Sequence, residues 1–487
     1  MSTIEGVDTS AWEMVVGLEV HVQLKTRTKA FCCCATDFGA PPNVNTCPVC
    51  LAMPGALPVL NAKAVELATR AAIALNCEVH TASVFARKNY FYPDSPKGYQ
   101  ITQFDQPLAA GGYLDIGARA DASNIRIGVT RVHIEEDAGK SVHDRYERAS
   151  AIDLNRAGTP LIEIVSEPDL RSAEQAGAYL RVLKQILEYI AVSDVSMEQG
   201  SLRVDANVSA RQHGETALGT KTELKNLNSF SGVERALAVE FARHVGVLRA
   251  GGTILQQTML WDAGTGEVRP SRTKEGSHDY RYFPEPDLPP LILSTDWIAK
   301  MTHDLPELPE ARRQRFAREY GLTDYDLDVI TANPRVADYY ESVARTHGDP
   351  KVAANWVMGE VLAQLKTDGI DISGFAIRPA DLAQLLDLVK GGVVSHTAAK
   401  QVFARMVMTG DSPGQIAERE GLIKVDDDAL LAGWLDEVIQ DMPAEAERYR
   451  AGEKRLQGVL IGAAMKKSKG RADPRKLNQL LAERLGS

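Results

Sequence analysis

The stretch Val15–Leu24, V-V-G-L-E-V-H-V-Q-L, decides the fold of the N-terminal half of the chain. From Val16 onward apolar and polar residues alternate strictly, which predicts a β-strand with one buried face. Glu19 and His21 share the polar face, about 7 Å apart, so both side chains could reach one ion or phosphate. Taken alone, the stretch favours a simpler alternative, an amphipathic strand with an exposed Glu–His pair.

Further apolar runs carry polar residues in the same way. Ser201–Ser209 alternates strictly, Ile127–Glu136 ends in two acids, and Leu161–Ser166 places Glu163 among large aliphatic residues. A carboxylate inside such a run is costly to bury unless it is paired or bound to a metal. The alternative is that Glu163 faces water on an edge strand. Together these runs predict one large sheet with a polar, concave side.

Four cysteines suggest a metal site. Cys32, Cys34, Cys47 and Cys50 follow the spacing C-x-C-x12-C-x2-C. Two thiol pairs separated by a loop rich in Pro, Gly and Asn suit a closed, tetrahedral and therefore structural zinc site. Cys33 has no assigned role, and Cys77 follows a helical apolar pattern and is expected in the core.

Composition and charge narrow the class of protein. The chain has 487 residues, of which 44% are hydrophobic and 25% charged, as in soluble globular proteins, and should hold about three domains. Met1–Trp12 lacks the features of a signal peptide, and no apolar run approaches the roughly 18 residues that span a bilayer. We expect a cytoplasmic protein with no membrane partner.

The C-terminal end is basic although the net charge of the chain is −10. Residues 448–487 hold eleven Lys and Arg against three acidic residues. This asymmetry predicts an acidic body with a basic terminal module that binds phosphates; the alternative is a solvated helical face without a partner. The candidate nucleic-acid contacts are Lys466, Lys467, Lys469, Arg471, Arg475 and Lys476. Aromatic residues make up only 6%, which argues against base stacking as the main mode of binding.

The order of the patterns predicts an α+β fold, with a large antiparallel sheet and packed helices followed by two all-helical domains. Helices are expected at Ser172–Ile190, with Ser172 as N-cap, and at about 232–250. A proline-rich exit places the first boundary near residue 293, and Thr409–Gly414 marks the second. The expected domains are 1–293, 294–408 and 409–487.

Common nucleotide-binding and nucleophile signatures are missing. Gly139–Ser141 reads G-K-S, but the P-loop glycine expected five positions earlier is Ile134. Lys140 and Lys88 remain candidate phosphate contacts. No signature of an activated serine occurs. Four of the cysteines are assigned to zinc, Cys33 lies among them, and Cys77 is expected in the core.

Nine motifs occur in an order that resembles one family. They are G-L-E-V-H-V, F-C-x-C…C-P-V-C, K-N-Y-F-Y-P-D, F-D-Q-P, H-I-E-E-D-A-G-K, D-L-N-R-A-G-T-P-L-I-E-I-V-S-E-P-D, S-L-R-V-D-A-N-V-S, E-L-K-N-L-N-S-F and D-Y-R-Y-F-P-E-P-D. From Val15 to about Leu485 the chain resembles the B subunit of the aspartyl/glutamyl-tRNA amidotransferase, the GatB family.

That resemblance implies a carbon–nitrogen ligase that uses glutamine as amido donor. ATP would phosphorylate the side-chain carboxylate of Glu on tRNA-Gln or of Asp on tRNA-Asn, and ammonia would displace the phosphate. The A subunit of the complex, an amidase, would release the ammonia from glutamine, and the small C subunit would brace the pair. A cradle-like N-terminal domain would hold the kinase and transamidase site, and residues 409–487 would form a YqeY-like tail that meets the tRNA.

The resemblance also implies site residues. His21, Glu136 and Glu163 would bind a divalent ion, with Glu19 nearby as a further catalytic residue. Mg²⁺ prefers oxygen ligands, so with a histidine ligand Mn²⁺ is an alternative identity for the ion. The four cysteines match the zinc-bearing version of the family.

The alternative from another class is a non-catalytic, zinc-containing tRNA-binding scaffold. The carboxylates of Glu19, Glu136 and Glu163 distinguish the two hypotheses. They would repel the phosphates of a bound tRNA unless a cation lay between, which favours the catalytic alternative.

Overall fold

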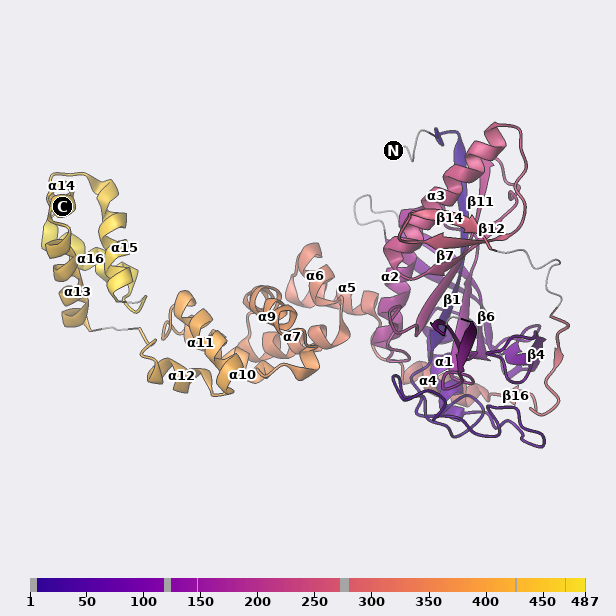
Figure 1. Cartoon of the computed structure of the whole chain (residues 1–487). Coiled ribbons are helices and arrows are strands. Elements are labelled where there is room, and N and C mark those ends of the chain that lie inside the picture. The colour runs from indigo at the N-terminus through magenta and orange to yellow at the C-terminus, as the bar shows by residue number, and fades with distance from the viewer. Residues whose placement is uncertain are drawn as a thin grey trace. The chain divides into compact units, whose positions relative to one another are not determined.

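The computed structural model describes residues 7–117, 124–146, 148–271, 280–424, 427–468 and 470–486. The chain divides into two compact units, Met1–Leu308 and Pro309–Ser487. The first unit contains strands and helices, and the second is helical (Figure 1). The first unit has one hydrophobic core and the second has two.

A nine-stranded sheet dominates the first unit, in the order β14-β13-β12-β11-β1-β10-β7-β6-β2. At its centre lies β1 (Trp12–Gln23), antiparallel to both β10 (Pro160–Ser166) and β11 (Leu202–Gln212). The remaining strands are β2 (Glu78–Val79), β6 (Ala109–Gly117), β7 (Asn124–Glu136), β12 (Thr222–Leu227), β13 (Thr258–Asp262) and β14 (Glu267–Pro270). The pairing of β12 with β13 is parallel and the others are antiparallel, which confirms the α+β prediction with one parallel addition.

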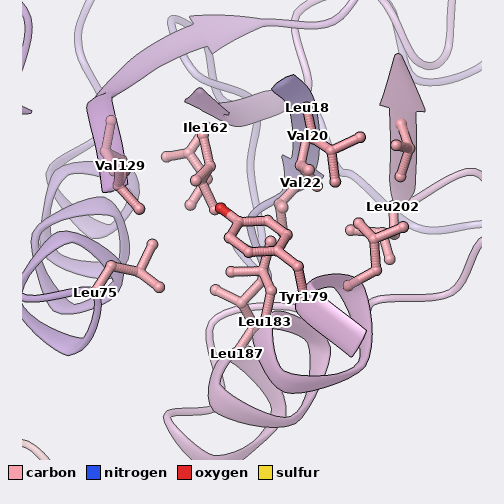
Figure 2. Close-up of a cluster of buried hydrophobic side chains, with 14 of the residues drawn as sticks. Leu18, Val20, Val22, Leu75, Val129, Ile162, Tyr179, Leu183, Leu187 and Leu202 are labelled. Atoms are coloured by element: carbon pink, nitrogen blue, oxygen red, sulfur yellow. The ribbon is translucent and has the colours of Figure 1, made fainter. Parts of the chain in front are cut away.

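The apolar face of the sheet packs against helices. In β1 the side chains of Val16, Leu18, Val20 and Val22 are at most 1% exposed. Figure 2 shows Leu18, Val20 and Val22 beside Tyr179 and Leu183 of α2 (Ala173–Tyr189). Two further helices, α1 (Ala62–Ala74) and α3 (Phe230–Arg249), contribute to the same core. The strict alternation of β1 therefore leaves its other face, with Glu19 and His21, turned away from the helices.

Serine caps fix the starts of two of these helices. The Ser172 hydroxyl accepts a hydrogen bond from the backbone N–H of Gln175, which confirms Ser172 as the N-cap of α2. Ser229 caps α3 in the same way, through the N–H of Gly232. Such caps satisfy N–H groups that the first helical turn leaves without partners.

Small sheets flank the large one. They comprise β4 (Phe85–Asn89) between β5 (Tyr99–Gln103) and β15 (Phe283–Pro284), β3 (Ala82–Ser83) with β16 (Leu291–Ile292), and β8 (Lys140–Tyr146) with β9 (Ala149–Asp153). The β4–β5 hairpin is tied to the end of β7, because the Gln103 side-chain oxygen accepts from the N–H of Ile134 at 2.9 Å. Gln100 donates to the backbone carbonyl of Glu136 at 2.6 Å. The hairpin is thereby held beside the end of β7.

The second unit consists of helices. They are α5 (Pro309–Tyr320), α6 (Asp324–Ile330), α7 (Pro334–His347), α8 (Pro350–Trp356), α9 (Leu362–Asp368), α10 (Pro379–Lys390), α11 (His396–Thr409), α12 (Pro413–Arg419), α13 (Asp428–Asp441), α14 (Pro443–Arg450), α15 (Gln457–Lys467) and α16 (Pro474–Leu485). A π-helical turn, Val357–Val361, joins α8 to α9, and single 3₁₀ turns occupy Ile372–Gly374 and Lys454–Leu456. None of the helices in the described part of the chain is long and apolar enough to cross a membrane.

The first compact unit ends at Leu308, and the first core of the helical unit extends to Leu422. Helix α4 (Thr295–His303) belongs to the first unit, because Trp297 and Ile298 pack against its core. In the second unit one core runs from Phe316 to Leu422 and therefore includes α12. A separate core gathers residues between Leu431 and Leu485.

A buried ionic network joins α3 to β12. The Glu240 carboxylate is fully buried and accepts hydrogen bonds from Thr222 Oγ1 at 2.8 Å and from Arg243 at 2.6 Å. His244 Nε2 lies 3.1 Å from it. Burial alone would raise the pKa of Glu240, but the hydrogen bonds from Arg243, His244 and Thr222 outweigh burial and lower it to about 2.

We predict that Glu240→Gln lowers the free energy of unfolding at pH 7 by about 1–3 kcal/mol, since a charged acceptor of several buried donors is lost. The folded-state pKa lies below the ordinary 4.5, so the stabilisation is complete above about pH 4.5 and is lost as the pH falls toward 2. Urea denaturation between pH 7 and pH 3 should show the gap between variant and wild type narrowing below about pH 4.5. Glu234→Gln, which changes a half-buried carboxylate on the same helix, is the control; a pH-independent gap for Glu240→Gln would contradict the prediction.

Candidate active site

The polar face of the sheet carries one row of side chains across four neighbouring strands. The strand register sets Arg203 of β11 opposite His21 of β1, His21 opposite Glu163 of β10, and Glu163 opposite His133 of β7. Directly opposed residues in antiparallel strands have Cβ atoms about 4.5–5.5 Å apart. The register alone therefore gathers one carboxylate, two imidazoles and one guanidinium.

Three ligand atoms converge in this row. His21 Nε2 lies 3.4 Å from Glu135 Oε1 and 3.4 Å from Glu163 Oε2, and one ligand atom from each residue lies within 4.8 Å of the others. Glu135 is only 1% exposed. Two buried carboxylates at such distances need a compensating cation, so the donor set of two carboxylates and one imidazole fits a divalent ion.

The pKa shifts of His21 and Glu163 also indicate that this site stabilises positive charge. Burial by itself lowers the pKa of His21, but the hydrogen bond to Glu163 and the charges of Glu135 and Glu163 raise it to about 9. Burial would raise the pKa of Glu163, but hydrogen bonds from His133 and His21 hold it well below its usual range. Without a metal ion the imidazolium of His21 supplies the charge that the carboxylates require.

The structure places Glu135, not Glu136, beside His21 and Glu163. Successive residues of a strand point to opposite faces, so Glu136 leaves β7 on the other side. Its Oε2 lies 2.5 Å from Lys97 Nζ, and its Oε1 accepts from the N–H of Ile101 at 2.9 Å. Glu136 lines a separate cavity of about 540 Å³ with Lys97 and Cys50. Val132 and Ile134 are buried and set this phase, but Ile127 and Val129 follow the opposite phase before the bulge near Val129, so the sequence leaves the choice open.

Glu19 lies on the same face as His21 but outside the three-atom cluster. Its Oε1 accepts a hydrogen bond from Asn207 Nδ2 at 3.0 Å. Burial raises the pKa of Glu19, and the nearby carboxylates of Glu163 and Glu223 raise it further. Glu19 is therefore the carboxylate of this face that takes up a proton most readily among those whose pKa shifts are resolved.

A cavity of about 890 Å³ opens over this face, bounded by the sheet, the β4–β5 hairpin and the segment around residues 280–282. Glu19, His21 and Glu163 line it, and so does Lys88, whose Nζ lies 4.9 Å from the centre of the Tyr280 ring. Burial alone would lower the pKa of Lys88, but the Glu135 carboxylate and neighbouring tyrosines raise it, so Lys88 stays cationic. Lys140, the other candidate phosphate contact, is exposed on β8 and does not line this cavity.

The four predicted cysteines also come together. One sulfur from each of Cys32, Cys34, Cys47 and Cys50 lies within 4.8 Å of the others, and the Sγ atoms of Cys47 and Cys50 are 3.9 Å apart. Zinc–sulfur bonds of about 2.3 Å in a tetrahedron require sulfurs about 3.8 Å apart, so the donor set fits zinc. Buried Lys29 places its Nζ 3.5 Å from Cys50 Sγ.

The surroundings of the Cys50 sulfur favour its thiolate form. A hydrogen bond from Cys32, the backbone N–H of Cys47 and the charge of Lys29 outweigh burial and lower the pKa of Cys50 to about 4. Cys33 is exposed and Cys77 is buried, as its helical pattern predicted.

Comparison with known proteins identifies the family. Residues 14–299 match the GatB/GatE catalytic domain, and residues 338–485 match the GatB domain. The chain is 51% identical over 475 residues to the B subunit of the aspartyl/glutamyl-tRNA(Asn/Gln) amidotransferase of Prosthecochloris aestuarii, covering 98% of each chain. The corresponding protein of Carboxydothermus hydrogenoformans is 49% identical over 477 residues, covering 97% of this chain and 99% of the relative.

This chain belongs to the GatB family. The resemblance expected from the nine motifs is thus confirmed. The catalytic-domain match contains β1, β7 and β10 with the His21 cluster, and also the four cysteines. The second match covers helices from α8 to α16 and so spans parts of both cores of the helical unit.

The basic residues at the C-terminal end of this GatB chain are partly neutralised. Lys467 Nζ lies 2.8 Å from both Glu437 and Asp441 of α13. Lys476 pairs with Asp428 of the same helix at 3.2 Å. Lys466 and Arg475 are exposed, Arg471 stacks over the Trp434 ring at 5.4 Å, and Lys469 lies outside the described residues. Asp428, Glu437 and Asp441 precede residue 448, so they offset part of the positive charge of residues 448–487 from outside that segment.

We predict that the purified chain contains about one zinc ion, and that Cys50→Ser lowers the zinc content and destabilises the loop 32–50. Cys33→Ser is the matched control, because Cys33 lies in the same loop but outside the four-sulfur group. Elemental analysis and limited proteolysis measure the two effects. Full zinc content in Cys50→Ser, or equal loss in Cys33→Ser, would contradict the assignment.

Proposed function

We propose that this chain is the kinase and transamidase component of a tRNA-dependent amidotransferase. It would convert Glu-tRNA-Gln, Asp-tRNA-Asn or both to the amidated forms in an ATP-dependent reaction. The observation that carries the proposal is the cluster of His21, Glu135 and Glu163. Two of its members, His21 and Glu163, line a cavity that cationic Lys88 also lines. The relatives' names specify the B subunit of an amidotransferase, and the chemistry of this cavity agrees with them.

The reaction needs positive charge at the place where this cluster lies. A side-chain carboxylate attacks the γ-phosphorus of ATP, which gives an acyl phosphate and ADP; ammonia then displaces phosphate and loses a proton. Both first substrates are anions, so their approach requires a cation between them. When bound by His21, Glu135 and Glu163, Mg²⁺ or Mn²⁺ would supply that charge. Mn²⁺ is included because one of the three ligands is an imidazole.

The chain's own residues supply the remaining functions. Lys88 binds phosphate oxygens as a cation that burial does not neutralise. Glu19, held by Asn207 and raised in pKa, accepts the proton that ammonia loses during attack on the acyl phosphate. His133 donates to Glu163 from the strand beyond and holds that carboxylate in place.

Ammonia has to come from a partner. Four of the six cysteines form one cluster, Cys33 stands beside it, and Cys77 is buried, which leaves no thiol at the cavity to act on glutamine. We propose the amidase, the A subunit of the complex, as the source and the small C subunit as the brace of the pair. Zinc at the four cysteines holds the loop, and the exposed basic residues of the tail contact tRNA.

A non-catalytic tRNA-binding scaffold is the weaker candidate. Its docking face would have to bring phosphates toward Glu19, Glu135 and Glu163, which repel them at short range. These carboxylates would bind a cation in a catalytic site, whereas on a passive docking surface they would only weaken the binding of tRNA.

We predict that Glu135→Gln and His21→Ala each lower the rate of amide formation at least about 100-fold. Each variant weakens the binding of the divalent ion that would stabilise the negative charge of the transition state. The complex is given Glu-tRNA-Gln, ATP and free ammonia, which bypasses the glutaminase. Mn²⁺ binding, followed by electron paramagnetic resonance, should weaken in parallel.

The control for this test is Glu136→Gln, which changes the adjacent carboxylate that faces Lys97. Its Mn²⁺ affinity should stay close to that of wild type. Lost affinity in Glu136→Gln together with unchanged affinity in Glu135→Gln would refute the assignment of the ion site.

For tRNA binding we predict that Lys466→Ala with Arg475→Ala reduces the salt dependence of the affinity. Each lost phosphate contact should lower the slope of log K against log salt by roughly 0.7–0.9. Lys467→Ala is the control, because Glu437 and Asp441 already neutralise this residue. Filter binding across a salt series gives the slopes, and an unchanged slope in the double variant would remove the tail from the tRNA interface.

A further inference from the structure

The side chain of Lys29 is fully buried, which is rare for a lysine without an ionic partner. Its Nζ donates hydrogen bonds to the backbone carbonyls of Asn45 at 2.7 Å and of Leu154 at 3.2 Å. The third acceptor is Cys50 Sγ, 3.5 Å away, so all three N–H donors of the ammonium group are used. In the described part of the chain no ion pair includes Lys29, which leaves the sulfur as the one acceptor of the three that can carry a negative charge.

The charge of the cysteine centre accounts for this burial. Four thiolates outnumber the two positive charges of Zn²⁺, so the occupied centre is anionic, and a buried charge is costly without compensation. The ammonium group of Lys29 supplies a compensating charge at Cys50. The alternative is that Lys29 only satisfies two carbonyls, but a neutral donor would do so without the cost of burying a cation.

The loop that carries the cysteines is also tied to the β9–β10 connection, residues 154–159. Asn43 Oδ1 accepts a hydrogen bond from the N–H of Leu154 at 2.7 Å. In the opposite direction, Asn155 Oδ1 accepts from the N–H of Asn45 at 2.8 Å. Two asparagine side chains therefore join the same two segments that the buried lysine joins.

Gly158 brings the connection into direct contact with the cysteine centre. A Cβ at this position would lie 3.4 Å from Lys29 Cδ and 3.7 Å from Cys50 Cβ. The backbone φ of +87° also favours glycine. The Gly158 carbonyl accepts a hydrogen bond from the N–H of Ala30 at 2.8 Å, so the chain on either side of the lysine is fixed to the connection.

The other side of the connection determines where two ligands of the divalent ion lie. The N–H of Gly158 donates to the carbonyl of Asp137 at 2.8 Å, and the N–H of Asp137 donates to the carbonyl of Thr159 at 2.8 Å. These bonds continue the β7–β10 ladder, which holds Glu135 and Glu163. A displacement of the connection would therefore shift these two carboxylates relative to each other.

We propose that Lys29 is a positioning residue that couples the cysteine centre to the divalent-ion site. With a metal ion at the four cysteines, its ammonium group holds the Cys50 sulfur and the Leu154 carbonyl together, and the β9–β10 connection keeps the position that Glu135 and Glu163 require. The inference rests on the proposed function for the identity of the divalent-ion site. Because coupling between two binding sites is reciprocal, each metal ion raises the affinity of the chain for the other.

The first test measures zinc affinity in the assembled complex with the variant Lys29→Met, which keeps most of the side-chain volume and removes the ammonium group. Lys25→Met is the matched control, because Lys25 is an exposed lysine of the same segment. Competition with a chelator under reducing conditions gives the affinities. We expect Lys29→Met to bind zinc about 10- to 100-fold more weakly than wild type, and Lys25→Met to match wild type.

A spectrum distinguishes contact with the sulfur from a purely structural role. Co²⁺ at the four cysteines gives a sulfur-to-metal charge-transfer absorption, and a hydrogen bond raises the energy of this band because it stabilises the sulfur lone pairs. Lys29→Met should therefore move the band to longer wavelength, and Lys25→Met should leave it in place. An unshifted band in Co²⁺-loaded Lys29→Met would overturn the proposal, as would unchanged zinc affinity.

The coupling is measured in the wild-type complex and so does not depend on the folding of a variant. Zinc is removed with a chelator, and the chelator is washed out before hydrogen–deuterium exchange and Mn²⁺ binding are measured. We expect faster exchange of the amides of residues 154–159 and a loss of Mn²⁺ affinity of at least about 5-fold, both reversed when zinc is restored.

Unchanged exchange at residues 154–159 after zinc removal would overturn the proposal, and so would unchanged Mn²⁺ affinity. Failure of the proposed function is recognised separately, because Mn²⁺ would then bind to Glu135→Gln as tightly as to wild type. In that case the zinc affinities, the Co²⁺ spectra and the exchange rates still decide whether Lys29 joins the cysteine centre to the β9–β10 connection.

Discussion

The central strand β1 has to serve a dry core on one side and a charged site on the other. Its valines and leucines seal the core against α2, while Glu19 and His21 emerge on the opposite face only one residue out of phase. Because the neighbouring strands are antiparallel and in register, the charged side chains of β7, β10 and β11 come to the same level. The position of the site is therefore a consequence of burying the other face of the sheet.

The buried carboxylates on the polar face of the sheet require a cation nearby. Glu135 and Glu163 are nearly inaccessible to water, and each lies near an imidazole. An arrangement of this kind is costly for stability when the positive charge is missing and favourable when it is present. A divalent ion that meets this demand, and a substrate phosphate that shares the ion, would be bound by groups that are already fixed in position.

Much of this architecture is readable in the sequence, because it follows from local rules. The alternation of β1, the Ser172 cap and the spacing of the four cysteines each depend on a few neighbouring residues. The choice between Glu135 and Glu136 depended on the phase of β7, which the pair of adjacent acids obscured. The stacking of Phe104 on Tyr282 beside the cavity could not be predicted, since the two residues are distant in sequence and an average aromatic content of 6% does not show where aromatic residues gather. The acids of α13 escaped notice for the same reason.

Adjacent glutamates at the end of β7 make that strand sensitive to changes in length. Glu135 belongs to the His21 cluster, and Glu136 lines the cavity beside the cysteines. One residue inserted or deleted in β7 before them would exchange their faces, although the composition of the strand would hardly change. The number of residues between the bulge near Val129 and Glu136 therefore matters more for the site than the identity of the core residues, which others of similar volume could replace.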